Sequence, residues 1–234
     1  MAMSQNTKII GIGSYGFDIV KFISANLYSD TSDSSYDDRL KFVMADVKVS
    51  DFVTKALLNN TQLIIAIADA SEGIEALNSI LAVAKKEKKT SVALIKGDLA
   101  LVSSNCDCFA EINNPLEAKR ICECITQSMY ASSLIAASME DIVEILKNGG
   151  KADFAVFEGD LEAVKAQIGE FGRLKEAKGV FCSMIIDLEK YADAAYDVLD
   201  VAEKAKNDSA SAIYALSAGG AAIDSYASCL TLSE

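Results

Sequence analysis

The sequence contains no histidine, no tryptophan and only one proline among its 234 residues. Without histidine, the chain cannot form the Ser-His or Cys-His pairs of many hydrolases, or a zinc site with imidazole ligands. The scarcity of proline and a hydrophobic fraction of 51% are typical of regular, packed elements rather than of disorder. Much hydrolase chemistry is thereby excluded, and the chain is expected to fold.

Basic residues are also scarce, because 22 Lys and Arg face 34 Asp and Glu, which gives a net charge of −12. A polyanionic partner such as nucleic acid would be repelled. The N-terminus lacks a basic region followed by an apolar stretch, and no segment approaches the roughly 20 apolar residues of a membrane span. We therefore expect a cytoplasmic protein with no membrane span and no nucleic-acid partner.

The six cysteines include two closely spaced pairs, Cys106 with Cys108 and Cys122 with Cys124. Without an export signal, reduced thiols are favoured over a disulfide framework. Four thiolates could bind zinc, but side chains two residues apart on a helix point roughly 200° away from each other. We therefore predict buried thiols and no metal site.

The first half of the chain alternates between short apolar runs and segments with helical spacing. The runs lie at residues 8–12, 42–45, 63–68 and 92–95, and the helical segments at 16–27, 50–58 and 73–86. This alternation predicts a Rossmann-like parallel sheet with helices on both faces, in an α/β domain over residues 1–130. The polar, acidic residues 29–38 are interpreted as a solvated surface loop.

The second half has a different pattern. A long helix should begin at Pro115, and residues 131–150 form the junction that follows it. Within this junction, Ser138 and the acidic residues after it indicate a helix N-terminus, and the helix should continue through Ile142 to Leu146 before the glycines of "KNGGK". Residues 151–234 should form a smaller α+β domain, in which the last two strands pair as a hairpin around Gly219 and Gly220. Its expected strands lie at 152–157, 179–186, 212–216 and 223–232, and its helices at 161–171 and 191–206.

The clearest motif is G-x-G-x-x-G at Gly11, Gly13 and Gly16, between an apolar run and a helical segment. Such glycines let phosphates approach the amides at a helix N-terminus. In an NAD site, an acidic residue should follow roughly 20 residues later. The candidate, Asp46, instead lies 30 residues after Gly16, so NAD binding remains an alternative rather than the favoured hypothesis.

In the order of its elements the chain resembles a divergent, shortened member of the FtsZ/tubulin family of cell-division GTPases. Gly11, Gly13 and Gly16 correspond to that family's first glycine-rich loop, where Ser14 and Tyr15 replace further glycines. The resemblance implies a Rossmann-like domain joined by a central helix to a smaller α+β domain. It also implies a GTP/GDP site formed by Gly11, Gly13, Ser14, Gly16, Asp46, Gly73 and Asn114.

The family's glycine- and threonine-rich signature loop corresponds here to "ADASEGIEA", in which only Gly73 remains. Asp69, Glu72 and Glu75 place carboxylates where the phosphates would lie. Each like-charge contact costs on the order of 1 kcal/mol in water, and more where water is excluded. We therefore expect no bound nucleotide. A Mg²⁺ site at these acids is a further alternative, less favoured than a solvated helix face.

The resemblance also locates the residues that would recognise the base and catalyse hydrolysis. Asn114 lies at the base-recognition position. In the synergy loop, which serves the nucleotide of the next subunit, Ala136 and Ser138 replace an Asn and an acid. Asp141 and the adjacent Glu140 are the remaining catalytic candidates, and acids at the start of a helix are the alternative interpretation.

These losses lead to one functional hypothesis and two alternatives. The hypothesis is a degenerate FtsZ-like protein without GTP hydrolysis that acts as a homo-oligomer or by binding a protein partner. A closed dimer is as consistent with the sequence as a filament. The alternatives are a nucleotide-binding module that still uses its glycine-rich loop for NAD or GTP, and a GTPase that becomes active on assembly.

Overall fold

The computed structural model describes residues 6–33, 35–48, 50–102, 104–147, 149–191, 194, 196–220 and 225–233. The chain divides into two compact units that interleave along the sequence. The first unit comprises Met1–Asn26, Asp37–Lys119 and Leu146–Ala152. The second comprises Leu27–Tyr36, Arg120–Ile145 and Asp153–Glu234. Each unit is therefore assembled from segments that are distant in the sequence.

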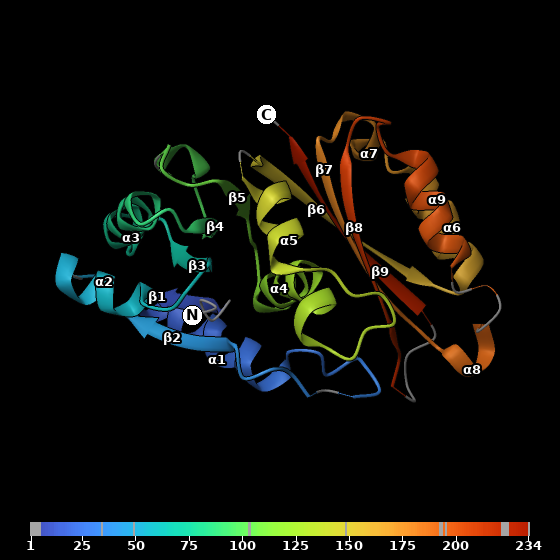
Figure 1. The fold of residues 1–234 in the computed structure, drawn as a ribbon, viewed down its shortest axis with the longest axis horizontal. Helices are drawn as coiled ribbons and strands as arrows, with labels where there is room; N and C mark the ends of the chain where they lie inside the picture. Colours follow the sequence, from blue (N-terminus) through green and yellow to red (C-terminus); the bar gives the residue numbers. More distant parts are fainter. Residues whose placement is uncertain are drawn as a thin grey trace. The chain divides into compact units, whose positions relative to one another are not determined.

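The first unit contains a parallel sheet with the strand order β2-β1-β3-β4-β5 (Figure 1). These strands are β1 (Thr7–Ile12), β2 (Leu40–Ala45), β3 (Leu63–Asp69), β4 (Thr90–Lys96) and β5 (Cys108–Glu111). The start of β6 (Gly150–Gly159) pairs in parallel with β5. All side chains of β3 except the last are buried, as expected for a parallel strand covered on both faces.

Helices cover both faces of this sheet. Helix α1 (Gly13–Asn26) contacts β1 and β3 through buried residues such as Ile19 and Ile23. On the other face, α2 (Asp51–Leu58) and α3 (Ile74–Lys86) contribute Leu58, Leu77 and further side chains to one apolar core. A short 3₁₀ helix, η1 (Leu99–Leu101), follows β4.

In the second unit the strand order is β6-β9-β7-β8. Strand β7 (Gly179–Ile186) is parallel to β8 (Ser211–Ala218) and antiparallel to β9 (Ser225–Ser233). Helices α6 (Leu161–Glu170) and α9 (Asp197–Ala205) pack on one face of these strands (Figure 1). The other face is contacted by the later residues of α4 (Pro115–Tyr130), whose Gln127 donates a hydrogen bond to Ser217 Oγ.

The remaining helices are short. They are α5 (Met139–Leu146), α7 (Arg173–Glu176) and α8 (Leu188–Tyr191). The helix expected over 191–206 differs from the structure, since α9 begins at Asp197. The helix predicted to start at Ser138 is confirmed, since α5 begins at Met139 and ends at Leu146. Among the described residues, no helix is long and apolar enough to cross a membrane.

The predicted fold class is confirmed, since an α/β unit with a parallel sheet is combined with a mixed α+β unit. The predicted hairpin is wrong, because β8 and β9 both pair with β7 and not with each other. The burial pattern gives the physical reason. Eight of the nine residues of β9 are buried, which favours a position inside the sheet, whereas the partly exposed β8 lies at its edge.

The acidic loop over residues 29–38 is only partly a solvated segment. Thr31 is buried and forms an isolated antiparallel bridge with Gly219, and Ser32 N donates to Ala218 O at 2.8 Å. Asp33 accepts a hydrogen bond from Ser132 Oγ at 2.8 Å. The interpretation as a solvated loop is therefore wrong at the buried Thr31, whereas Ser29, Ser32 and Asp33 are exposed as expected.

Candidate functional site

The glycine-rich turn between β1 and α1 is tightly packed. A Cβ atom on Gly11 would lie 2.2 Å from the carbonyl oxygen of Gly16, and one on Gly16 would lie 2.5 Å from the carbonyl oxygen of Ile67. Gly13 has a φ of +70°, in the left-handed region that favours glycine. Gly11 and Gly16 are thus required by the close approach of α1 to β1 and β3, and Gly13 by its backbone conformation, independently of any ligand.

The N-terminus of α1 faces the carboxylate of Glu72. Glu72 Oε2 accepts a hydrogen bond from Ser14 Oγ at 2.7 Å, and Oε1 accepts one from Ser14 N at 3.3 Å. A Cβ atom on Gly13 would lie only 3.0 Å from Glu72 Cδ. A helix N-terminus attracts anions through its free amides and its dipole. In this chain, the Glu72 carboxylate itself occupies the place where a bound anion would be favoured.

A second acidic residue of the same loop, Asp69, is neutralised locally. Its carboxylate accepts hydrogen bonds from Ser71 N at 2.8 Å and from Ser71 Oγ at 2.6 Å, and it forms an ion pair with Lys96 at 3.3 Å. These contacts, the Ser71 hydrogen bonds foremost, lower the pKa of Asp69. Asp69 is therefore a stable carboxylate at neutral pH.

Lys96 also lies over an aromatic ring. Its Nζ is 4.8 Å from the centroid of the Tyr15 ring, a cation–π distance. Burial, followed by the charges of Asp69 and Glu117, raises the pKa of Tyr15. Tyr15 thus places a neutral ring where the family resemblance expects a glycine. The ammonium that could have neutralised a phosphate contacts this ring and Asp69 instead.

Two other predicted nucleotide contacts lie in this unit. The exposed Asp46 accepts a hydrogen bond from Val47 N at 2.6 Å. Gly73 precedes α3 and packs against β1 and β3, since a Cβ atom there would lie 3.2 Å from Ile12 Cγ2 and 3.3 Å from Ala68 Cβ. An open cavity of about 480 Å³ nearby is lined by residues 47, 48, 50, 75, 76 and 79.

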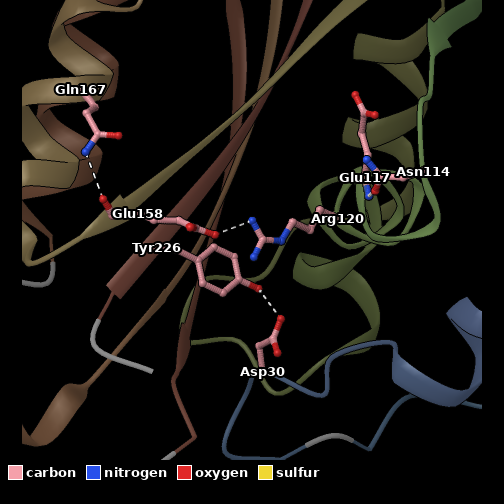
Figure 2. A network of polar contacts seen from close by, with 7 residues as sticks. All are labelled: Asp30, Asn114, Glu117, Arg120, Glu158, Gln167 and Tyr226. Carbon is pink, nitrogen blue, oxygen red and sulfur yellow. Dashed lines mark hydrogen bonds and ion pairs between the residues drawn. The ribbon is translucent and has the colours of Figure 1, made fainter. Parts of the chain in front are cut away.

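Asn114, the predicted base-recognition residue, begins helix α4. Its Oδ1 accepts a hydrogen bond from Glu117 N at 2.9 Å, and Asn113 N donates to Glu117 Oε2 at 2.8 Å. Asn114 therefore caps the helix, and Glu117 reaches back to the residue before the cap, one position earlier than in a capping box. Figure 2 shows the Asn114 and Glu117 side chains together at the start of the helix. The Asn114 side-chain oxygen is therefore engaged in holding the helix N-terminus.

The catalytic candidates Glu140 and Asp141 lie in the second unit, in the first turn of α5. Asp141 Oδ2 accepts hydrogen bonds from Ser138 Oγ at 2.7 Å and from Ser138 N at 3.2 Å, while Asp141 N donates to Ser138 Oγ at 3.1 Å. These hydrogen bonds lower the pKa of Asp141. The geometry fits the alternative interpretation, acids that stabilise a helix start.

The cysteines do not form a metal centre in the described part of the chain, where no group of three or more Cys, Asp or Glu side chains could hold an ion. All six cysteines are free. Burial raises the pKa of Cys106 to about 11, and the buried Cys124 Sγ donates to Phe181 O and Ser228 O, each at 3.3 Å. Cys106 and Cys124 are therefore packed, protonated thiols.

A polar cluster that the sequence does not indicate lies in the second unit and is shown in Figure 2. Arg120 forms an ion pair with Glu158 at 2.7 Å, and its guanidinium lies 4.8 Å from the centroid of the Tyr226 ring. Tyr226 Oη in turn donates to Asp30 Oδ2 at 3.2 Å. The cluster joins α4, β6, β9 and the segment after α1. No local sequence motif indicates this cluster, because its members are far apart in the sequence.

The structure thus brings together Gly11, Gly13, Ser14 and Gly16 with Glu72 at one helix N-terminus. Asp46, Gly73 and Asn114 belong to the same unit, whereas Glu140 and Asp141 belong to the other unit. The parallel sheet with a glycine-rich first turn, a long helix beginning at Pro115 and a mixed sheet after it define the FtsZ/tubulin-like fold.

Solved structures support this assignment. FtsZ from M. jannaschii, in a mutant form, is similar over 99% of this chain and 91% of its own, with a TM-score of 0.75 and 13% identity. CetZ from Methanosaeta thermophila is similar over 98% of this chain and 87% of its own, with a TM-score of 0.57 and 12% identity. TubZ from Bacillus thuringiensis serovar israelensis, in GDP-form protofilaments, is similar over 98% of this chain and 85% of its own, with a TM-score of 0.59 and 10% identity.

The predicted FtsZ/tubulin resemblance is therefore confirmed at the level of the fold. No protein-family model matches the sequence. A comparison with curated proteins likewise finds no match.

Proposed function

We propose that this chain is an FtsZ/tubulin-like protein of the cytoskeletal or cell-division type that has lost GTP hydrolysis and acts through self-association or a protein partner. The observation that carries the proposal is the Glu72 carboxylate at the N-terminus of α1, 2.7 Å from Ser14 Oγ. A phosphate placed there would have to displace this carboxylate or lie beside it, and like charges in contact repel.

The other candidate residues support the same conclusion. Asp69, Asn114 and Asp141 each accept hydrogen bonds from neighbours close in sequence. Ala136 and Ser138 replace polar and acidic side chains that the resemblance implies for hydrolysis. Each loop has thus gained a structural use for residues that would otherwise contact a nucleotide.

Self-association is proposed from the related structures. One FtsZ structure from M. jannaschii is an empty dimer, with a TM-score of 0.74 and 14% identity to this chain, and TubZ forms protofilaments. Sedimentation velocity over a hundredfold range of protein concentration would test whether this chain assembles. If the protein stays monomeric at every concentration, self-association is contradicted, and binding of a protein partner remains the proposed mode of action.

Calorimetric titration with GTP, GDP and NAD⁺, with and without Mg²⁺, tests the loss of the nucleotide site. We expect no saturable heat for any of the three and no release of phosphate from GTP. Saturable micromolar GTP binding, with turnover that rises with protein concentration and is lost in Asp141→Asn, would overturn the proposal in favour of a GTPase activated on assembly.

A nucleotide-binding module is the second candidate function, and one observation favours it. The turn at Gly11, Gly13 and Gly16 retains the tight geometry and the positive φ at Gly13 that bring a helix N-terminus close to a ligand. This candidate predicts a nucleotide that co-purifies with the protein and is lost in Gly13→Val. A wild-type protein with no nucleotide absorbance after purification would argue against it.

A further inference from the structure

Strand β8 has a free edge along its first half. Its odd-numbered residues pair with β7, as shown by the hydrogen bonds from Ser211 N to Lys178 O at 3.1 Å and from Gly219 N to Ile186 O at 2.6 Å. Since backbone groups alternate in direction along a strand, the even-numbered residues direct their N–H and C=O groups away from β7. At Ala212 and Tyr214, no residue in the described ranges pairs with these groups.

The second half of the same edge is covered by the chain itself. Leu134 N donates to Leu216 O at 2.7 Å, Leu216 N donates to Ser133 Oγ at 3.2 Å, and Ala218 O accepts a hydrogen bond from Ser32 N at 2.8 Å. An uncovered strand edge is a template for pairing with another chain. The open portion is therefore short, and it ends where the segment at Ser133 and Leu134 closes over β8.

A cavity of about 430 Å³ lies against this open edge. The segment before α5, α5 itself and the start of β8 supply its described lining residues. Ile135, Ile145 and Ile213 supply apolar surface, and Asp141 and Glu144 supply two exposed carboxylates, with no basic residue in the lining. The pKa of Asp141 is lowered by its Ser138 hydrogen bonds, so this wall is negatively charged at neutral pH.

We propose that the open edge of β8 at Ala212 and Tyr214 is a docking site for a short extended segment of a partner protein with basic residues at alternate positions. Each of the two edge residues offers one donor and one acceptor, so the segment would add as a strand. Lysine or arginine side chains two residues apart on one face are about 7 Å apart. That spacing suits Asp141 and Glu144, which are neighbours on α5 at i and i+3.

This inference names the kind of partner that the proposed function leaves open, and it rests on that function only in expecting a partner. The assay below uses no nucleotide. A negative peptide result would therefore leave the calorimetric result on GTP unchanged, and GTP turnover would leave the peptide result unchanged.

The test uses a fluorescein-labelled peptide, acetyl-Lys-Val-Lys-Val-Lys-amide, and the chain of 234 residues. We expect a saturable rise in anisotropy that weakens with added salt, and no binding of the matching Glu-Val-Glu-Val-Glu peptide. Two N-methylated versions of the basic peptide give the decisive comparison. Methylation of the amides that face β8 should abolish binding, whereas methylation of the alternate amides should change it less than threefold, since only one set pairs with a strand.

Protein variants locate the site. Glu144→Gln should weaken binding of the basic peptide about threefold to tenfold, and Glu144→Lys should weaken it further. Glu170→Gln is the matched control, because it removes the same charge from an exposed helical position of the same unit outside the cavity lining, and it should change binding less than twofold. Circular dichroism melting would confirm that each variant is folded.

Three outcomes would overturn the proposal. The first is equal binding of the basic and acidic peptides. The second is that both methylated peptides lose binding equally, or that neither loses binding, which would indicate charge attraction without strand pairing. The third is a dimer in sedimentation velocity that Glu144→Lys disrupts and that the basic peptide does not dissociate. In that case a second copy of the chain would cover the edge instead of a basic segment.

Discussion

Two pairs of the same chemical kind, a serine and an acid at the N-terminus of a helix, have different origins in this molecule. Ser138 and Asp141 are three residues apart and form a local capping box on α5. Ser14 and Glu72 are 58 residues apart and meet at α1 through the packing of β1 against β3. The first pair stabilises α5 through contacts within its own first turn, so it depends only on residues close in sequence. We propose that the second pair closes an anion site, so that its main effect is on binding.

The largest expected effect concerns the glycines that bring α1 close to the sheet. Gly11→Ala should lower the free energy of unfolding by at least about 3 kcal/mol, because its Cβ would lie 2.2 Å from the carbonyl oxygen of Gly16. Urea denaturation without nucleotide measures this loss. Gly172→Ala, at a position with no neighbouring atom within 4 Å, is the control and should be nearly neutral. A neutral Gly11→Ala would show that packing does not explain this glycine.

Removal of the distant acid should open the site at α1. In Glu72→Ala, we expect the affinity for GDP or inorganic phosphate to rise at least about tenfold over wild type, which corresponds to about 1.4 kcal/mol. Calorimetry measures the change. Glu75→Ala removes the same charge from the adjacent helix turn without touching Ser14, and it should have a much smaller effect. Equal gains in both variants would mean that net charge, rather than the Ser14–Glu72 contact, excludes the anion.

Removal of the local cap should affect stability alone. Ser138→Ala should lower the Tm by about 2–4 °C, as the loss of an N-cap does in a chain of this size. Ser24→Ala, which removes an exposed hydroxyl bonded to Lys21 O within α1, should change the Tm less. Differential scanning calorimetry measures both. A change in phosphate affinity in Ser138→Ala would break the distinction between the two serine–acid pairs.

The smallest effect is a pH dependence that arises from Asp69, in the same loop as Glu72. The Ser71 hydrogen bonds and Lys96 lower the pKa of Asp69 in the folded state below its ordinary value of about 3.9. The folded state therefore gains stability above that value and loses it as the pH falls through the lowered pKa. Thermal melting between pH 6 and pH 2.5 should show a shallower decline for Asp69→Asn than for wild type, and parallel curves would exclude this role.

Sequence patterns predicted most of the elements. The parallel strands of the first unit and strand β7 lie where apolar runs indicated, because a buried parallel strand is apolar along its whole length. The resemblance in Gly11, Gly13 and Gly16 pointed to the correct fold. The pairing of β9 was mispredicted, since strands adjacent in sequence usually pair, and here the burial of β9 on both faces decided the order.

By itself, the sequence determined the alternation of elements, the turn at the three glycines and the local cap at Ser138. Each of these depends on residues within a few positions of one another. Only the tertiary structure decided that Glu72 reaches Ser14, that Lys96 lies over Tyr15, and that β8 has an open edge beside Asp141 and Glu144. The physical reason is that these contacts join segments brought together by sheet order and helix packing, which no local periodicity encodes.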